Sequence, residues 1–296
     1  MQVHLRVPAS SANIGAGFDS LGLALSLYNE AVMEEYDGVD IQSLDGTEIP
    51  QGKGNLLFRS AARLYEICGR PLPGLRIRQI NRIPQTRGLG SSSACIAAGL
   101  VGANTLLGNP MEQESLVSLA AQIEGHPDNT TPALLGGLTV SVMEYGKVYY
   151  AKKSLGKDLS FLCMIPDFPV STREARALLP KTIAHADAVF NLSRTALMVA
   201  SLFSGDYHNV RIASKDRLYT PYRTGLIPHA GEIIEFCEQA GALAVFVSGA
   251  GPTIVAMTRA DTPIEDAVRA FFDRQALPWR TMTLSADNDG TAACIK

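Results

Sequence analysis

The chain has 296 residues, 46% of them hydrophobic, and a formal net charge of −3 at pH 7. That length allows two domains of ordinary size, and the apolar content gives each of them a core. Charges of both signs are mixed along the chain, so no basic patch indicates a nucleic-acid partner, and the apolar runs are too short to cross a membrane. No basic-then-apolar leader opens the chain, and five scattered cysteines without Cys-x-x-Cys spacing are typical of a reducing compartment. We therefore expect a cytoplasmic globular protein.

The first segment that suggests a site lies near the start of the chain. Residues 3–7 alternate apolar and polar side chains like a strand, and residues 8–19 (PASSANIGAGFD) follow as a tight loop. Glycine, serine and asparagine in such a loop most often mean a plain connection between strands. Here, however, Asn13 and Asp19 place an amide and a carboxylate on one glycine-flexed loop, which suits the binding of a polar substrate.

The next stretch of the sequence predicts a capped helix. Residues 29–54 have the composition of strands and turns, and residues 56–68 form an amphipathic stretch. Asn55 directly precedes this stretch, and asparagine is a favoured residue at a helix N-cap.

The strongest indication of phosphate binding is residues 84–95 (PQTRGLGSSSAC). Residues 75–80 before it alternate like a half-buried strand, and residues 95–107 after it are apolar or small over a length that suits a buried helix. Glycines let the backbone approach a ligand, and a helix start carries free N–H groups and partial positive charge, so this junction predicts an anion site. The alternative is a plain junction whose serine only caps the helix. Because no Gly-Lys-Ser/Thr follows the glycines, it is not a Walker A loop.

A dense polar segment follows the next predicted helix, residues 111–123. Residues 124–133 (EGHPDNTTPA) bring Glu124, His126, Asp128 and Asn129 within six positions, beside glycine and proline. A lone glutamate is usually solvated and a lone histidine usually structural, but this density favours a site. Mg²⁺ accepts oxygen ligands and several waters, so Glu124 with a serine hydroxyl is a candidate magnesium site.

The rest of the chain alternates predicted strands and helices. Residues 136–142 predict the strand that closes a first domain near residue 150, and Ser171 or Thr172 caps a short helix on which Thr172 and Arg176 face the same side. Residues 248–253 (SGAGPT) are typical of a hairpin loop. The other predicted elements are strands at 159–165, 242–247, 254–257 and 279–284 and helices at 191–204, 233–240 and 264–273.

Three of these segments resemble the ordered motifs of the GHMP small-molecule kinases. Residues 84–92 match the phosphate loop Pro-x-x-x-Gly-Leu-Gly-Ser-Ser, residues 8–19 resemble the opening of the homoserine kinase branch, and residues 248–253 resemble the third, glycine-rich loop. The resemblance implies an α+β GHMP kinase fold, with an N-terminal domain like ribosomal protein S5 domain 2 (residues 1–152) and a ferredoxin-like C-terminal domain (residues 153–296). It also implies ATP- and Mg²⁺-dependent phosphorylation of the side-chain hydroxyl of L-homoserine to O-phospho-L-homoserine, in threonine biosynthesis. A homodimer is compatible with this resemblance.

The resemblance also implies roles for individual residues. Thr172 to Arg176 match a Thr-x-x-Ala-Arg element, and Arg223 ends an Asp-x-x-x-x-Pro-Tyr-Arg element; in the family both arginines grip the substrate carboxylate. The implied substrate-binding set is Asn13, Asp19, His126, Asn129, Thr172, Arg176, Arg223 and Gly249. The implied ATP-binding set is Asn55, Pro84, Gln85, Thr86, Arg87, Gly88, Leu89, Gly90, Ser91, Ser92, Ser93 and Ala94. The implied metal ligands are Ser91, Ser92 and Glu124, and the implied catalytic residues are Asn129, Glu124 and Ser92.

The sequence leaves several alternatives open. Glu124 aligns with the family's metal carboxylate only across a deletion, and Asn55 is as well suited to a helix cap as to a nucleotide contact. Mevalonate-type relatives have an aspartate base where this chain has Asn129, which cannot take a proton, so Asn129 is expected to orient the hydroxyl and Asp128 is the rival base. A kinase for a sugar or a mevalonate-like alcohol, or a non-enzymatic sensor on the same fold, are the two other classes.

Overall fold

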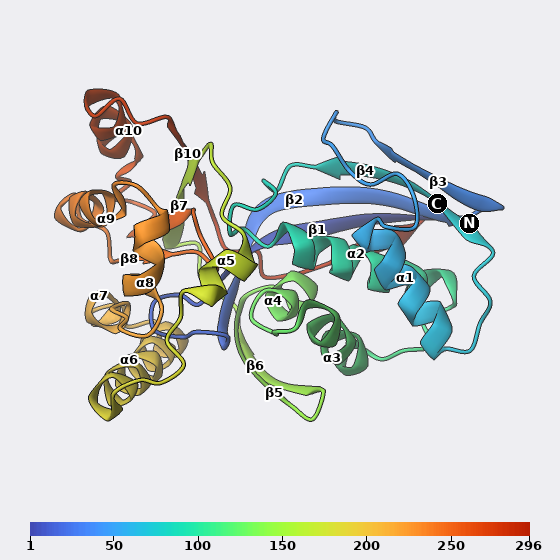
Figure 1. Ribbon diagram of the computed structural model, residues 1–296, viewed down its shortest axis with the longest axis horizontal. Coiled ribbons are helices and arrows are strands. Elements are labelled where there is room, and N and C mark those ends of the chain that lie inside the picture. Colours follow the sequence, from blue (N-terminus) through green and yellow to red (C-terminus); the bar gives the residue numbers. More distant parts are fainter.

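The computed structural model describes residues 1–296 and divides into two α+β units, each built on its own sheet (Figure 1). The first sheet has seven strands, in the order β11-β1-β2-β4-β3, with β5 paired to β2 and β6 paired to β5. All of these pairs are antiparallel except β3–β4. The strands are β1 (Gln2–Ala12), β2 (Leu21–Glu35), β3 (Gly38–Ser43), β4 (Gly74–Asn81), β5 (Leu138–Glu144), β6 (Lys147–Lys153) and β11 (Ala292–Ile295).

Four helices cover one side of this sheet: α1 (Leu56–Ile67), α2 (Ser91–Leu106), α3 (Gln113–Glu124) and α4 (Thr130–Leu135) (Figure 1). Helix α2 lies innermost and is apolar or small on nearly all sides, which is why it packs against the sheet, α1, α3 and α4 at once. Gly99 makes the close approach to α1 possible, because a Cβ there would lie 2.3 Å from the carbonyl oxygen of Leu57. The packing of α2 therefore fixes the position of its N-terminus.

The second sheet has four strands in the order β10-β7-β9-β8, and every neighbouring pair is antiparallel. Its strands are β7 (Leu159–Pro166), β8 (Ala244–Val247), β9 (Ile254–Arg259) and β10 (Trp279–Leu284). The chain runs through helices between the first and second strands and between the third and fourth, which is the ferredoxin-like arrangement. These helices are α5 (Thr172–Ala177), α6 (His185–Ser204), α7 (Val210–Ala213), α8 (Thr220–Arg223), the 3₁₀ turn η1 (Thr224–Leu226), α9 (Ala230–Gln239) and α10 (Glu265–Arg274).

The structure confirms the predicted α+β fold and differs from the sequence prediction in two places. Strand β6 ends at Lys153 and β7 begins at Leu159, but β11 returns from the C-terminal half to pair with β1 of the first sheet. Its four residues are exposed and carry no alternation of apolar and polar side chains, so only its register with β1 defines it as a strand. Strand β2 also runs unbroken to Glu35, into the segment 29–54 whose composition predicts strands and turns, because β1 and β4 pair with its polar second half.

All five cysteines are free, and none of the helices combines the length and the apolar composition that a membrane-spanning segment needs. Burial raises the pKa of the Cys163 thiol, and of the Cys237 thiol, to about 12, so both behave as apolar core residues.

Candidate active site

A polar cavity of about 190 Å³ is lined by residues from both units. The short helix α5, which contributes to the lining, lies where the two units meet (Figure 1). Its lining comes from the loop between β1 and β2, the phosphate loop before α2, the turn between α3 and α4, the start of α5, the end of α8 and the loop between β8 and β9. The lining residues are Asn13, Phe18, Asp19, Pro84, Thr86, Arg87, Gly88, Gly90, Ser91, Ser92, Glu124, His126, Asp128, Asn129, Val170, Ser171, Thr172, Arg176, Arg223, Gly249, Ala250 and Gly251. Most residues that the sequence singles out therefore come together in one place.

The three glycine-rich loops touch one another directly. The Ser248 hydroxyl donates to the Gly88 carbonyl at 2.6 Å, and the Gly249 N–H donates to the Ala12 carbonyl at 3.1 Å. Gly88 has a φ of +75°, and a Cβ at this position would lie 2.3 Å from the carbonyl oxygen of Ser248. Only glycine allows this contact without displacing the backbone of the third loop, so the third loop packs directly against the phosphate loop.

The start of α2 has the properties of an anion site rather than of a side-chain-capped junction. Its N-cap is Gly90, with φ 72°, and no side chain makes a capping hydrogen bond. Ala94 is the first residue whose N–H bonds back to Gly90, so the N–H groups of Ser91, Ser92 and Ser93 have no intrahelical partner. These N–H groups and the positive end of the helix dipole can bind phosphate oxygens, which favours the hypothesis of a phosphate site over that of a serine-capped junction.

Glu124 is the last residue of α3 and faces this helix start. Its carboxylate accepts a hydrogen bond from the Ser92 hydroxyl at 2.8 Å and one from the Ser93 hydroxyl at 3.1 Å. The contact supports the alignment of Glu124 across the deletion, although Ser93 rather than Ser91 accompanies Ser92. A carboxylate beside hydroxyl oxygens is a donor set of the kind that Mg²⁺ prefers, so the residues present fit this ion.

Asp19 and Arg176 form an ion pair in the cavity. The Arg176 guanidinium forks onto the Asp19 carboxylate with N···O distances of 2.6 and 3.0 Å. This hydrogen bonding raises the pKa of Arg176 above its ordinary value. The resemblance implies that both groups bind the substrate, whereas the structure shows them bound to each other. A ligand that has both a carboxylate and an ammonium must therefore displace this ion pair. Its carboxylate takes the place of Asp19 beside Arg176, and its ammonium takes the place of Arg176 beside Asp19.

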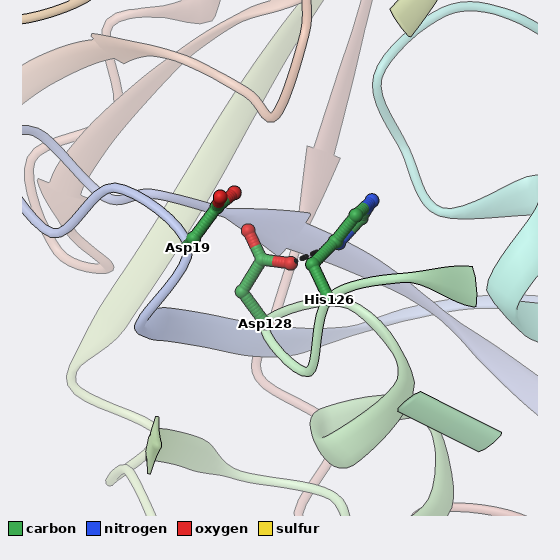
Figure 2. A group of neighbouring side chains, drawn as sticks. All are labelled: Asp19, His126 and Asp128. Atoms are coloured by element: carbon green, nitrogen blue, oxygen red, sulfur yellow. Dashed lines mark hydrogen bonds and ion pairs between the residues drawn. The ribbon is translucent and has the colours of Figure 1, made fainter. Parts of the chain in front are cut away.

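Figure 2 shows the Asp128 carboxylate between Asp19 and the imidazole of His126. Asp128 is buried, and one of its oxygens lies 2.5 Å from Nδ1 of His126. Burial by itself would lower the pKa of His126, but the hydrogen bond and charge of Asp128 raise it above its ordinary value. Atoms of these three side chains that could ligate a metal lie within 4.8 Å of one another, but the Asp19 carboxylate is already paired with the Arg176 guanidinium. The Glu124 carboxylate, which hydroxyl groups but no cation contact, is therefore a better candidate for metal binding than this cluster.

Arg223 is the most unusual charge in the site, because only 2% of it is exposed and it bonds to a backbone carbonyl rather than forming an ion pair. Its Nη1 donates to the Gly249 carbonyl at 2.9 Å, whereas its Nε is buried without a hydrogen-bond partner. Burial lowers the pKa of this guanidinium. A buried cation that lacks an anion is unfavourable, and since Arg223 borders the cavity, a bound anion can neutralise it.

Phe18, to which the sequence assigns no role, lies between the two arginines of the site. Its ring centroid is 5.3 Å from the guanidinium carbon of Arg176 and 5.1 Å from that of Arg223. Cation–π contacts of this kind hold both guanidinium groups in place without consuming their N–H donors. The only sequence signal was an aromatic residue inside the glycine-rich loop, directly before Asp19.

Five residues of the implied ATP-binding set do not line the cavity. Asn55 caps α1: its side-chain oxygen accepts from the N–H groups of Leu57 and Phe58, and its amide donates to Pro50 and Gln79. The capping alternative is thus confirmed, and the carboxamide has no group left for a nucleotide. The other four are Gln85, which lies beside a neighbouring cleft, Ser93, which bonds to Glu124, and Leu89 and Ala94, which are buried and can offer only their backbone.

Comparison with known proteins agrees with this geometry. The family model for the GHMP kinases N terminal domain matches residues 55–137, and the model for the GHMP kinases C terminal domain matches residues 198–275. Fold and site thus define the class of a GHMP small-molecule kinase.

Curated relatives narrow this class. The homoserine kinase of Caldicellulosiruptor bescii is 45% identical over 293 residues, covering 97% of this chain and 95% of the relative. That of Clostridium botulinum (strain Okra) is 41% identical over 291 residues, covering 98% and 97%. The crystal structure of homoserine kinase from Cytophaga hutchinsonii superimposes with a TM-score of 0.89 at 30% identity, covering 99% of this chain and 97% of that one. The chain belongs to the homoserine kinase family.

Proposed function

We propose that this chain transfers the γ-phosphoryl group of ATP to the side-chain hydroxyl of L-homoserine, with Mg²⁺, giving O-phospho-L-homoserine for threonine biosynthesis. The observation that carries the proposal is Arg223, a buried guanidinium with an unpartnered Nε at the edge of a cavity that also contains a phosphate loop. Such a site needs an acceptor alcohol that brings an anion of its own. A sugar or another uncharged alcohol would leave this guanidinium without a counter-ion.

The substrate carboxylate lies between Arg223 and Arg176 in this proposal. Guanidinium groups bind carboxylates through paired N–H donors, and both of these groups are already oriented by the ring of Phe18. When Arg176 turns to the carboxylate, the Asp19 carboxylate becomes free for the substrate ammonium. The Asp128 carboxylate beside it adds negative charge at the same place. Without substrate, Asp19 and Arg176 thus neutralise each other. When the amino acid binds, its ammonium pairs with Asp19 and its carboxylate pairs with Arg176.

The phosphates of ATP bind at the start of α2, where backbone N–H groups of the phosphate loop can reach the γ-phosphoryl oxygens. When bound at Glu124, Mg²⁺ would neutralise charge that develops on the phosphates. Ser92 and Ser93 hold the Glu124 carboxylate toward the loop. Phosphoryl transfer depends mainly on alignment and charge stabilisation, and this arrangement provides both.

Asn129 borders the cavity between the phosphate loop and the substrate groups, and its carboxamide can orient the acceptor hydroxyl. Since an amide cannot take the hydroxyl proton, the proton goes to a phosphate oxygen or to solvent, with Asp128 as the alternative acceptor. Asp128 is already hydrogen-bonded to His126, which fixes its orientation. The free cysteines suit a reaction in the reducing cytoplasm.

A direct test identifies the product. Incubation of the protein with ATP, Mg²⁺ and L-homoserine is expected to produce a phosphate monoester of homoserine, visible by ³¹P NMR together with ADP. ADP formation without this ester, or at the same rate when homoserine is omitted, would contradict the proposal.

A further inference from the structure

Ser10 is a fully buried residue of β1 that touches both the phosphate loop and Asn129. Its backbone N–H donates to the Leu89 carbonyl at 3.1 Å, and its hydroxyl donates to Oδ1 of Asn129 at 2.9 Å. Its Oγ also lies so close to Gly90 that a Cβ there would be 2.0 Å from it. The hydroxyl is thus held in one place, against the start of α2.

Asn129 depends on this hydroxyl for its orientation. It occupies the N-cap of α4, where an asparagine side chain usually binds the first N–H groups of the helix, yet it makes no such bond. The hydrogen bond from Ser10 is the only one that its carboxamide makes within the protein. Its amide nitrogen points toward Gly249 on the opposite loop and so toward the cavity.

We infer that Ser10 is a positioning residue, which turns the Asn129 carboxamide so that its oxygen faces the protein and its NH₂ faces the reacting groups. The inference rests on the proposed function and adds a chemical statement to it. Asn129 then offers only hydrogen-bond donors to the site, so its NH₂ donates to a lone pair of the acceptor hydroxyl or to a phosphoryl oxygen, and its oxygen does not accept a hydrogen bond from the hydroxyl.

A double-mutant cycle tests the inference. Ser10→Ala is expected to lower kcat by roughly 3- to 15-fold, the equivalent of one hydrogen bond, with little change in the KM for homoserine. In an Asn129→Ala background the same substitution should lower kcat by less than about twofold, because there is no carboxamide left to orient. Ser10→Cys keeps a side-chain donor at this position, but only a weak one, and should behave like Ser10→Ala.

Ser11 provides the matched control. It is the next residue, equally buried, but its hydroxyl bonds to Ser248 at 2.7 Å and not to Asn129. Ser11→Ala should therefore have the same effect on kcat with and without Asn129. An equal loss from Ser10→Ala in both backgrounds would overturn the positioning role, as would full activity of Ser10→Cys. Failure of the wild-type protein to phosphorylate homoserine would instead overturn the proposed function.

Discussion

Replacement of Arg223 by methionine separates substrate recognition from stability. The methionine side chain fills a similar volume but carries no charge. Arg223 has 2% of its surface exposed, and burial lowers the pKa of its guanidinium, so the folded protein keeps this charge at a desolvation cost. Exchange of a buried charge for an apolar side chain is often neutral or stabilising, and the melting temperature of Arg223→Met is therefore expected not to fall.

The effect on catalysis should be large. Removal of one partner of a buried, charged hydrogen bond costs about 2–5 kcal/mol. If Arg223 binds the substrate carboxylate, kcat/KM for homoserine falls by roughly thirty- to several-thousand-fold. The assay is steady-state ADP release with homoserine, and in parallel with 3-amino-1-propanol, which has the ammonium and the hydroxyl but no carboxylate.

The two substrates and a control variant decide the outcome. The amino alcohol should react slowly with the wild-type protein and almost as slowly with Arg223→Met, because it never uses the guanidinium. Arg173→Met provides the control, since Arg173 is an exposed arginine on α5 that does not line the cavity. Equal losses with both substrates, or a clear drop in melting temperature, would mean that Arg223 supports the fold or the nucleotide instead.

Three further substitutions test other parts of the site. Glu124→Gln should lower kcat strongly and raise the Mg²⁺ concentration needed for half-maximal rate, because a neutral amide is a poorer ligand for a hard cation. Asn129→Ala should lower kcat without abolishing it, and Asp128→Asn should not lower kcat more than Asn129→Ala does. Gly88→Ala should raise the KM for ATP and lower the melting temperature, since φ is +75° and a Cβ would meet Ser248 at 2.3 Å. Gly231→Ala, in open space on α9, should leave the KM unchanged and stabilise the fold by up to about 1 kcal/mol.

Each of these substitutions has an outcome that contradicts the assignment. An unchanged Mg²⁺ dependence of Glu124→Gln would place the metal elsewhere. A wild-type rate for Asn129→Ala, or a greater loss of kcat from Asp128→Asn, would assign the role of proton acceptor to Asp128. A normal KM for ATP in Gly88→Ala would show that nucleotide binding tolerates movement of this loop.

Much of the fold was predictable because its elements follow local rules. The alternation of apolar and polar residues predicts β4, the long apolar run predicts α2, and Asn55 as an N-cap predicts the start of α1. Strand β11 was not predictable, because it owes its conformation to β1 alone and has no pattern of its own.

The site was predictable as a set of residues but not as a set of contacts. The order of the motifs predicts that Asp19, Arg176 and Arg223 belong to one site. It does not predict that Asp19 pairs with Arg176, or that the Arg223 guanidinium has no anion beside it. Nor does it indicate Phe18 or Ser10, whose roles depend on neighbours far away in the sequence. Such information exists only once the loops are packed together.

The central claim is that this site selects an alcohol that is also an amino acid. Competition between alcohols in one coupled assay with ATP and Mg²⁺ tests it most directly, with L-homoserine, 3-amino-1-propanol, galactose and mevalonate as acceptors. We predict that kcat/KM for homoserine exceeds that of every other acceptor by at least about a hundredfold, because only homoserine carries both a carboxylate for the two arginines and an ammonium for Asp19. Turnover of galactose or mevalonate with an efficiency equal to that of homoserine would contradict it.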